Sequence, residues 1–241
     1  MLKRFALQAL VIAAISGPAF AQELTDERIK ELALEAILEN PQIVMDAVAI
    51  LREREAEAQA ATAAETLETQ RAELERDENA PVLGNPNGDV TVIEFFDYNC
   101  PYCRRAKPVI EALVAADDNV RIVFREFPIL GDASVYAARA ALAAREQGLY
   151  EEFHWGLMDL SGRVTEAAVE RVAEQVGLDM EQLRTDMEAD AVSEHIETSL
   201  SLAQSLGITG TPSFVVGDSI LPGLVDQARL EELIELRRNE S

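Results

Sequence analysis

Cysteine and histidine are scarce in this chain, which contains two of each in 241 residues. Two cysteines exclude a scaffold held together by several disulfides, so folding must depend on an ordinary apolar core, for which the chain is long enough. Structural zinc normally takes four ligands, whereas His154 and His195 each lie in a helical pattern far from any partner at ligand spacing. The sequence therefore predicts no metal site and implies no cofactor.

Positive charge is also in short supply, because 21 lysine and arginine residues face 44 acidic ones and give a formal net charge of −23. Phosphate backbones and anionic lipids attract proteins through clustered cations. This charge balance therefore argues against nucleic acid or an anionic membrane surface as a partner.

Long apolar runs are missing, and the apolar run near the N-terminus is short. Two cations, the apolar run Phe5–Ile15 and small residues at positions 19 and 21 form the pattern of a secretory signal. The run is shorter than the about 20 residues that a membrane-spanning helix needs. We expect residues 1–21 to be a signal peptide and the mature chain to begin near Gln22, in the periplasm, without membrane insertion.

Glycine and proline are absent between Gln42 and Asn79, where alanine, glutamate, arginine and leucine dominate. After a first helix that ends at Asn40, this composition predicts one long helix through residue 79. Residues 22–51 carry an apolar stripe that one helix cannot bury by itself. We interpret them as an arm that joins copies into a dimer or trimer, with an intramolecular cap as the alternative. Residues 52–80 are interpreted as a helical or partly frayed linker.

Both cysteines lie where a predicted strand, Asp89–Phe96, gives way to a predicted helix. Unpaired N–H groups and the helix dipole stabilise an anion at such a position, and Cys-x-x-Cys thiols there titrate at about 3.5 to 7.5. We therefore expect Cys100 to be the exposed, attacking thiolate and Cys103, one turn later, the shielded resolving thiol. A structural disulfide or two packing cysteines are the competing interpretations.

Glu94 places a carboxyl group inside the otherwise apolar strand that precedes the cysteines. Burying such a group is costly unless it has a partner or a task. We interpret Glu94 as a proton acceptor for Cys103, and an edge residue or an ion pair is the alternative.

The order of the remaining elements indicates an α/β fold. A strand at Val120–Phe127 completes a strand–helix–strand unit, helical patterns fill residues 133–206, and a hairpin and a terminal helix follow. His154 and Trp155 fall in the second of these helical patterns, where we expect a packed aromatic pair rather than a ligand or catalytic site.

Three motifs make this chain resemble the DsbA family of exported thiol:disulfide oxidoreductases. They are Glu94-Phe95-Phe96, Cys100-Pro101-Tyr102-Cys103 and Gly210-Thr211-Pro212. The resemblance implies a thioredoxin fold over residues 81–241 with an inserted α-helical domain at about 131–207, preceded by the helical arm. It also implies a cis bond between Thr211 and Pro212 and a substrate strand that pairs with Thr211. Pro101 and Tyr102 complete the substrate-contacting residues, and Glu94 matches the family's buried glutamate.

One position departs from DsbA itself, which has histidine where this chain has Tyr102. Tyrosine offers no cation, so we expect a less acidic Cys100 and a less oxidising disulfide. The arm is similar in architecture to those of exported disulfide isomerases and suppressor-of-copper-sensitivity C proteins.

The predicted function is thiol–disulfide exchange on protein and peptide substrates by an isomerase or reductase, recycled by a membrane redox partner. One alternative is a DsbA-like dithiol oxidase. Another is a periplasmic copper-binding or metal-resistance protein that uses the same two thiols.

Overall fold

The computed structural model describes residues 25–240, which fall into two compact units, one up to Glu53 and one from Arg54 onward. The predicted signal peptide, residues 1–21, lies outside the described residues. None of the helices in the described part is long and apolar enough to cross a bilayer.

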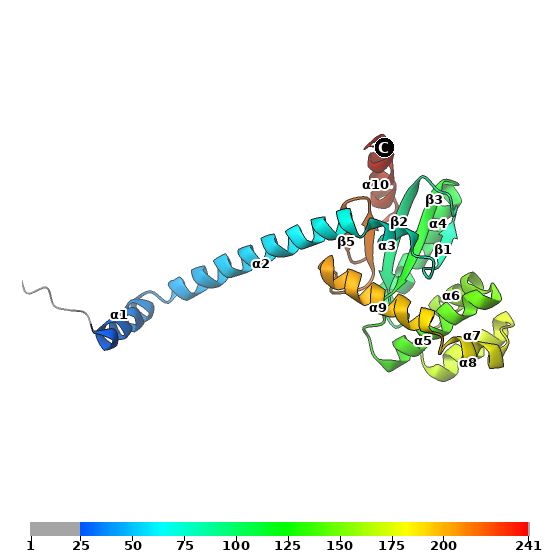
Figure 1. Ribbon diagram of the computed structural model, residues 1–241, viewed down its shortest axis with the longest axis horizontal. Helices are drawn as coiled ribbons and strands as arrows, with labels where there is room; N and C mark the ends of the chain where they lie inside the picture. The colour runs from blue at the N-terminus through cyan, green and yellow to red at the C-terminus, as the bar shows by residue number, and fades with distance from the viewer. Residues whose placement is uncertain (1–24, 241) are drawn as a thin grey trace, which may run out of the picture. The chain divides into compact units, whose positions relative to one another are not determined.

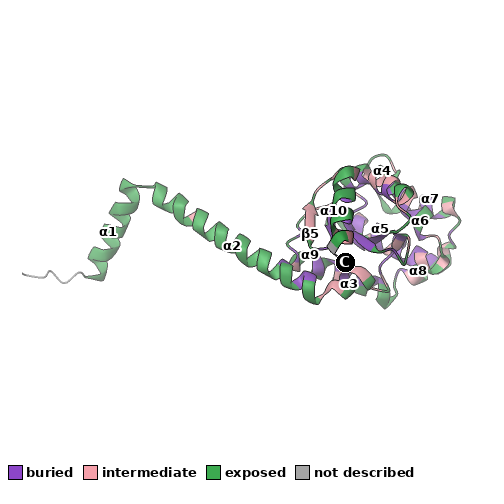
Figure 2. Cartoon of the chain, turned by 90° about the horizontal axis from the view of Figure 1, so that it is seen from above, coloured by how far each residue is buried: buried purple, intermediate pink, exposed green. Residues whose placement is uncertain are grey.

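The first unit contains helix α1 (Asp26–Glu39) and the beginning of α2 (Gln42–Thr69). Thr25, a residue type favoured at helix N-caps, caps α1, with its hydroxyl accepting from the backbone N–H of Arg28 at 3.3 Å. α1 buries no residue within the chain, and it is green throughout in Figure 2. Large apolar side chains exposed in this unit are Ile29, Leu32, Leu34, Ile37, Leu38, Ile43, Val44, Met45, Ile50 and Leu51.

The second unit is built on a five-stranded sheet with the order β1-β3-β2-β4-β5 (Figure 1). The strands are β1 (Val82–Gly84), β2 (Val90–Phe96), β3 (Val120–Glu126), β4 (Ser213–Val216) and β5 (Ser219–Pro222). β2 and β3 run parallel across helix α4 (Pro101–Ala116), and the other neighbours are antiparallel. This confirms the predicted strand–helix–strand unit and hairpin, whereas the short edge strand β1 was not predicted.

The helical insertion lies between β3 and β4. It comprises α5 (Asp132–Ala144), the 3-10 turn η1 (Arg145–Gln147), α6 (Tyr150–Met158), α7 (Glu166–Val176), α8 (Met180–Asp186) and α9 (Asp190–Ser205). Helix α10 (Gln227–Glu240) ends the chain, with the Asp226 carboxylate accepting from the N–H of Arg229 at 2.9 Å. Leu230, Leu233 and Ile234 are buried, whereas Leu236 is exposed.

Alternation along β2 sends side chains to two different cores. Val92 and Phe96 belong to the core shared with α4, α10 and the insertion, whereas Ile93 and Phe95 belong to the core shared with α9. Because side chains two apart share a face, Glu94 points to the same face as Val92 and Phe96. That face carries α4 and therefore the cysteines.

Residues 54–62 are exposed, but from Ala63 onward the segment is part of the core shared with α9, here called the second core, and is not a solvated linker. Ala63, Leu67 and Leu74 are buried against Ile93 and Phe95. The predicted single helix to residue 79 is also wrong, because α2 ends at Thr69 and a separate helix, α3 (Arg71–Arg76), follows. Packing of this segment onto the sheet, which no local pattern encodes, explains both differences.

A buried ion pair, here called the linker clamp, fastens the end of this segment to the sheet. Arg125, 0% exposed, donates to Asp77 at 2.6 Å and to the Leu74 carbonyl at 3.2 Å. His195 from α9 lies 3.6 Å from the same carboxylate. Although burial opposes ionisation, the nearby His195 ring, a hydrogen bond from the N–H of Asn79 and the charge of Arg125 lower the pKa of Asp77. The clamp therefore holds a charged pair inside the protein.

Candidate active site

The cysteines lie at the start of α4, directly after the carboxyl end of β2. Cys100 is the N-cap, its N–H donating to the Asp97 carbonyl at 2.9 Å, and Pro101 is the first helical residue. Both sulfurs are free thiols. Cys100 is 4% exposed and Cys103 1%, so the expectation of an exposed Cys100 is wrong. The loop that carries Thr211 contacts Cys100 and accounts for this burial.

The two thiols have opposite acidities. A hydrogen bond from the Cys103 thiol, with others from the Thr211 side chain and the N–H groups of Cys103 and Tyr102, lowers the pKa of Cys100 to about 5 against the effect of burial. Burial raises the pKa of Cys103 far above its usual range, and the hydrogen bond to Cys100 and the charge of Glu94 add to this. At neutral pH the pair is therefore one thiolate and one thiol. The pKa of Cys100, about 5, lies above the pKa of about 3.5 known for the corresponding cysteine of DsbA.

Glu94 lies in the middle of β2, where it pairs in register with Phe124 on one side and Phe214 on the other. It is 3% exposed, and its Oε1 atom has no hydrogen-bond partner among the described residues. Burial, with the charge of Cys100, raises the pKa of Glu94 to about 8. The carboxyl group is therefore mostly protonated at neutral pH and poised to ionise just above it.

The loop before β4 faces the nucleophile. The peptide bond between Thr211 and Pro212 is cis, as the family resemblance implies. The Pro212 carbonyl accepts from Gly223 at 2.8 Å, and the Ser213 hydroxyl donates to the Gly210 carbonyl at 2.8 Å. In its thiol form Cys100 donates to the Thr211 carbonyl at 3.1 Å. The hairpin thus holds a backbone acceptor directly against the sulfur.

Pro101 and Tyr102, between the cysteines, are exposed. The Tyr102 side chain is 51% exposed, and the guanidinium carbon of Arg105 lies 4.4 Å from the centre of its ring. A cation therefore lies beside the position where DsbA has histidine, although it is supplied from the next turn of the helix.

Asp97 organises the cysteine loop, a role that the sequence reasoning missed. Its carboxylate accepts from the N–H of Asn99 at 2.7 Å, the Ser134 hydroxyl at 2.7 Å and the N–H of Leu130 at 2.9 Å. Its backbone carbonyl accepts from Cys100, and its N–H donates to Cys103. The Asp-x-Asn spacing before the first cysteine was the available local signal, since it favours this type of turn.

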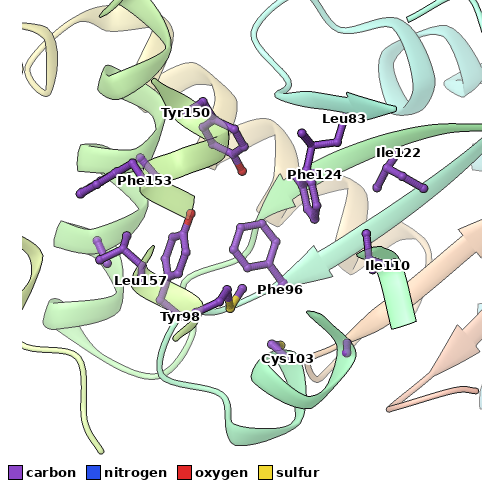
Figure 3. Close-up of a cluster of buried hydrophobic side chains, with 14 of the residues drawn as sticks. Leu83, Phe96, Tyr98, Cys103, Ile110, Ile122, Phe124, Tyr150, Phe153 and Leu157 are labelled. Atoms are coloured by element: carbon purple, nitrogen blue, oxygen red, sulfur yellow. The ribbon is translucent and has the colours of Figure 1, made fainter. Parts of the chain in front are cut away.

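A second buried acid, Glu126 at the end of β3, was also missed. The Tyr98 hydroxyl lies 3.2 Å from Glu126 and 2.9 Å from Nδ1 of His154. Figure 3 shows Tyr98 and Tyr150 within the same cluster as Phe96 and Phe124. Burial raises the pKa of Glu126 well above its usual range, and burial lowers the pKa of His154 to about 3, so His154 is neutral. His154 contacts Trp155 with ring centres 4.5 Å apart, which confirms the packed pair.

A thioredoxin-type sheet with an acidic thiol at the start of the first helix, a buried resolving thiol and a facing cis-proline defines a thiol:disulfide oxidoreductase. Among residues 25–240, no group of three or more histidine, cysteine, aspartate or glutamate side chains is placed to hold a metal ion.

Residues 91–235 match the DSBA-like thioredoxin domain family, and the chain belongs to that family. A thioredoxin-like oxidoreductase from Silicibacter pomeroyi is 60% identical, with a TM-score of 0.69 over 70% of this chain and 98% of that one. A linker-deletion mutant of Proteus mirabilis ScsC is 25% identical, with a TM-score of 0.70 over 93% of this chain and 100% of that one. The chain is thus ScsC-like over both of its units.

Curated relatives include much longer proteins. The Na⁺/H⁺ antiporter NhaA 3 of Salinispora tropica is 35% identical over 138 residues, which are 56% of this chain and 21% of the antiporter. The chain spans about a fifth of the length of that relative, so the similarity concerns one part of the antiporter only.

Proposed function

We propose that this chain reduces and reshuffles disulfides in polypeptide substrates through Cys100 and Cys103. The observation that carries the proposal is the separation of the two thiol acidities, since the pKa of Cys100 is lowered to about 5 while that of Cys103 is raised. One sulfur attacks at neutral pH, and the other waits as a thiol until the first has reacted.

In the first step the Cys100 thiolate attacks one sulfur of a substrate disulfide. The substrate S–S bond breaks, a mixed disulfide forms, and the second substrate sulfur leaves as a thiolate that takes a proton from water. Deprotonation of Cys100 also frees the Thr211 carbonyl, which the thiol form had engaged at 3.1 Å. A substrate N–H takes that place, so backbone pairing at Thr211 beside Pro212 positions substrates of many sequences. Pro101 and Tyr102 provide the exposed contact surface.

Glu94 serves the second step as proton acceptor for Cys103. Negative charge on Cys100 raises the pKa of both Glu94 and Cys103. Formation of the mixed disulfide removes that charge, so both pKa values fall together. Glu94 then releases its own proton to water, its carboxylate accepts the Cys103 proton, and the new Cys103 thiolate attacks the Cys100 sulfur and breaks the mixed disulfide. The reduced substrate leaves, and a membrane redox partner must return the Cys100–Cys103 disulfide to the dithiol for another cycle.

Residues 22–51 act as the oligomerisation arm in this proposal, and a cleavable signal at 1–21 directs the chain to the periplasm. Each large apolar side chain left in water forfeits about 1.5 to 3 kcal/mol that burial would contribute. A second or third copy supplies the missing surface. Several Cys100 thiolates then meet one misfolded substrate at high effective concentration, which favours reshuffling over simple exchange.

The test is refolding of a scrambled multi-disulfide protein beside insulin reduction. The full mature chain is compared with a chain that begins at Arg54, because Ala63, Leu67 and Leu74 belong to the second core and must stay. We expect the shortened chain to be a monomer that reduces insulin but has lost most isomerase activity. A monomeric full-length chain in light scattering would contradict the arm assignment, and failure to reduce insulin would contradict the proposed chemistry.

A further inference from the structure

Helix α4 begins with cations although helix starts favour acids. No acid lies in its first turn, whereas α1, α5, α6, α7, α8 and α9 each have an acidic residue there. Arg104, Arg105 and Lys107 fill its first two turns, in a chain of net charge −23. Positive charge at this end of a helix opposes the helix dipole. The helix dipole therefore does not explain these residues, and such a departure points to function.

Arg104 is fixed in the wall of the site. Its Nε and Nη2 donate to the Tyr98 carbonyl at 3.3 and 3.1 Å, and its Nη1 donates to the Gly162 carbonyl. Arg105 lies over the exposed Tyr102 ring. Within the described part of the chain neither guanidinium forms an ion pair, whereas Lys107 pairs with Asp159 at 2.6 Å.

Arg163 extends this surface on the side of the insertion. The Asn99 side chain, next to Cys100, accepts from the N–H of Val164 at 2.8 Å and donates to its carbonyl at 3.4 Å. Arg104 holds the preceding Gly162. These bonds pin the backbone of Arg163 beside the cysteine loop, and its exposed side chain has no ion-pair partner in the described residues. We call Arg104, Arg105 and Arg163 the arginine collar.

The collar is not needed to make Cys100 acidic. Hydrogen bonds from Cys103, Thr211 and the backbone of Tyr102 account for the lowered pKa of Cys100. Its three charges therefore remain available to a molecule that arrives at the sulfur.

We propose that the arginine collar binds acidic residues that flank the reacting cysteine of a polypeptide substrate. The inference rests on the proposed function, since the substrate sulfur must reach Cys100. An extended chain advances about 3.3 Å per residue, so side chains within a few positions of that cysteine lie over α4 and the Gly162–Val164 segment. Unpaired guanidinium groups attract carboxylates there, whereas basic segments are drawn to the acidic remainder of the surface.

The experiment uses three disulfide-linked peptides that differ only in the residues beside cysteine, which are glutamate, glutamine or lysine. We expect the full mature chain to reduce the glutamate peptide with a kcat/KM about tenfold above that of the lysine peptide at low salt. The preference should disappear in about 0.5 M sodium chloride, because salt screens exposed charges.

Arg105→Gln should reduce the preference for the glutamate peptide, and Arg105→Glu should reduce it further. The matched control is Arg76→Glu, which makes the same change in net charge at an exposed arginine of α3, on the opposite face of the sheet. Equal rates for all three peptides in the wild type, or an equal shift in Arg76→Glu, would overturn the collar alone. Failure of the wild type to reduce any peptide would instead overturn the proposed function.

Discussion

Asp97 in the cysteine loop and Asp77 in the linker clamp start from the same local turn. Each carboxylate accepts the backbone N–H two residues on, from Asn99 at 2.7 Å and from Asn79 at 2.8 Å. The remaining partners differ. Asp97 meets a hydroxyl and a backbone N–H, whereas Asp77 meets Arg125 and His195.

The same aspartate turn therefore has two different roles, and the role depends on the face of the sheet on which its other partners lie. Neutral donors around Asp97 fix the loop geometry beside a thiolate. The buried cation at Asp77 instead joins a segment to the sheet. We expect changes on the cysteine side to alter chemistry more than stability, and changes in the clamp to do the reverse.

Cys100→Ser is the strongest test of the cysteine side. Turnover of insulin should be lost completely, because no other sulfur has a lowered pKa. Serine is a good N-cap residue, so the free energy of unfolding should not fall. Cys103→Ser, as the companion variant, should accumulate a mixed disulfide visible by mass spectrometry. Residual turnover by Cys100→Ser would refute the assigned nucleophile.

Arg125→Met is the corresponding test of the clamp. Removing one partner of a buried ion pair should lower the free energy of unfolding by about 3 to 5 kcal/mol, measured in urea. The alkylation rate of Cys100 in the folded protein should not change. The exposed Arg76→Met provides the control and should shift stability by less than about 0.5 kcal/mol. A change in Cys100 reactivity would show that the two regions are coupled.

Asp97→Asn sharpens the comparison at the shared turn. An amide cannot accept from all three donors, so the loop should loosen and the pKa of Cys100 should rise, as followed by thiolate absorbance. Insulin reduction at neutral pH should fall about tenfold, equivalent to about 1.4 kcal/mol. Asp77→Asn should leave the pKa of Cys100 unchanged while reducing stability. Equal pKa shifts in the two variants would contradict the division of roles.

Glu94→Gln examines a buried acid that, unlike both aspartates, has an unpartnered oxygen. The pKa of Glu94 is about 8 in the dithiol form and falls in the mixed disulfide, where the Cys100 charge is gone but burial still raises it, so the carboxylate form increases as pH rises through the range below 8. Resolution of the mixed disulfide should therefore accelerate over this range in the wild type. Glutamine should remove that acceleration and slow the step, as stopped-flow kinetics would report. An unchanged pH profile would make Glu94 structural.

The smallest expected effect is the change of the Cys100 alkylation rate with pH across the neutral range. A lowered pKa of about 5 keeps the thiolate form throughout the neutral range, so the rate should be nearly flat there and halve near pH 5. Peptide mapping should find Cys103 unmodified. A midpoint near the usual thiol pKa would contradict the hydrogen bonding described at the helix start.

Elements with a strong local signal were predictable from sequence. The apolar run of β2, the glycine turn of the hairpin and the Thr25 cap each specify their own structure. Glu94 was predicted as a site residue because it places a carboxyl group in an apolar strand. The two cysteines were predicted because they form a Cys-x-x-Cys motif where a strand gives way to a helix. Thr211 and Pro212 required the family resemblance, since an arbitrary Pro bond is cis in only about 5 to 6% of cases.

Features that depend on distant partners were not predictable. Leu67 and Leu74 lie among charges in the sequence, yet the sheet face that receives them comes from Ile93 and Phe95. Asp97 draws its donors from Leu130 and Ser134, more than thirty positions away. The environment of Glu126 similarly depends on Tyr98 and on Tyr150 of α6, which lie at distant sequence positions. In each case the structural role of the residue depends on partners that are distant in the sequence.

The two cysteines of the active site are also the whole cysteine content of the chain. No second pair exists with which either sulfur could be wrongly joined during biogenesis. The chain therefore has a single possible intramolecular disulfide, and its folding requires no choice among alternative cysteine pairings.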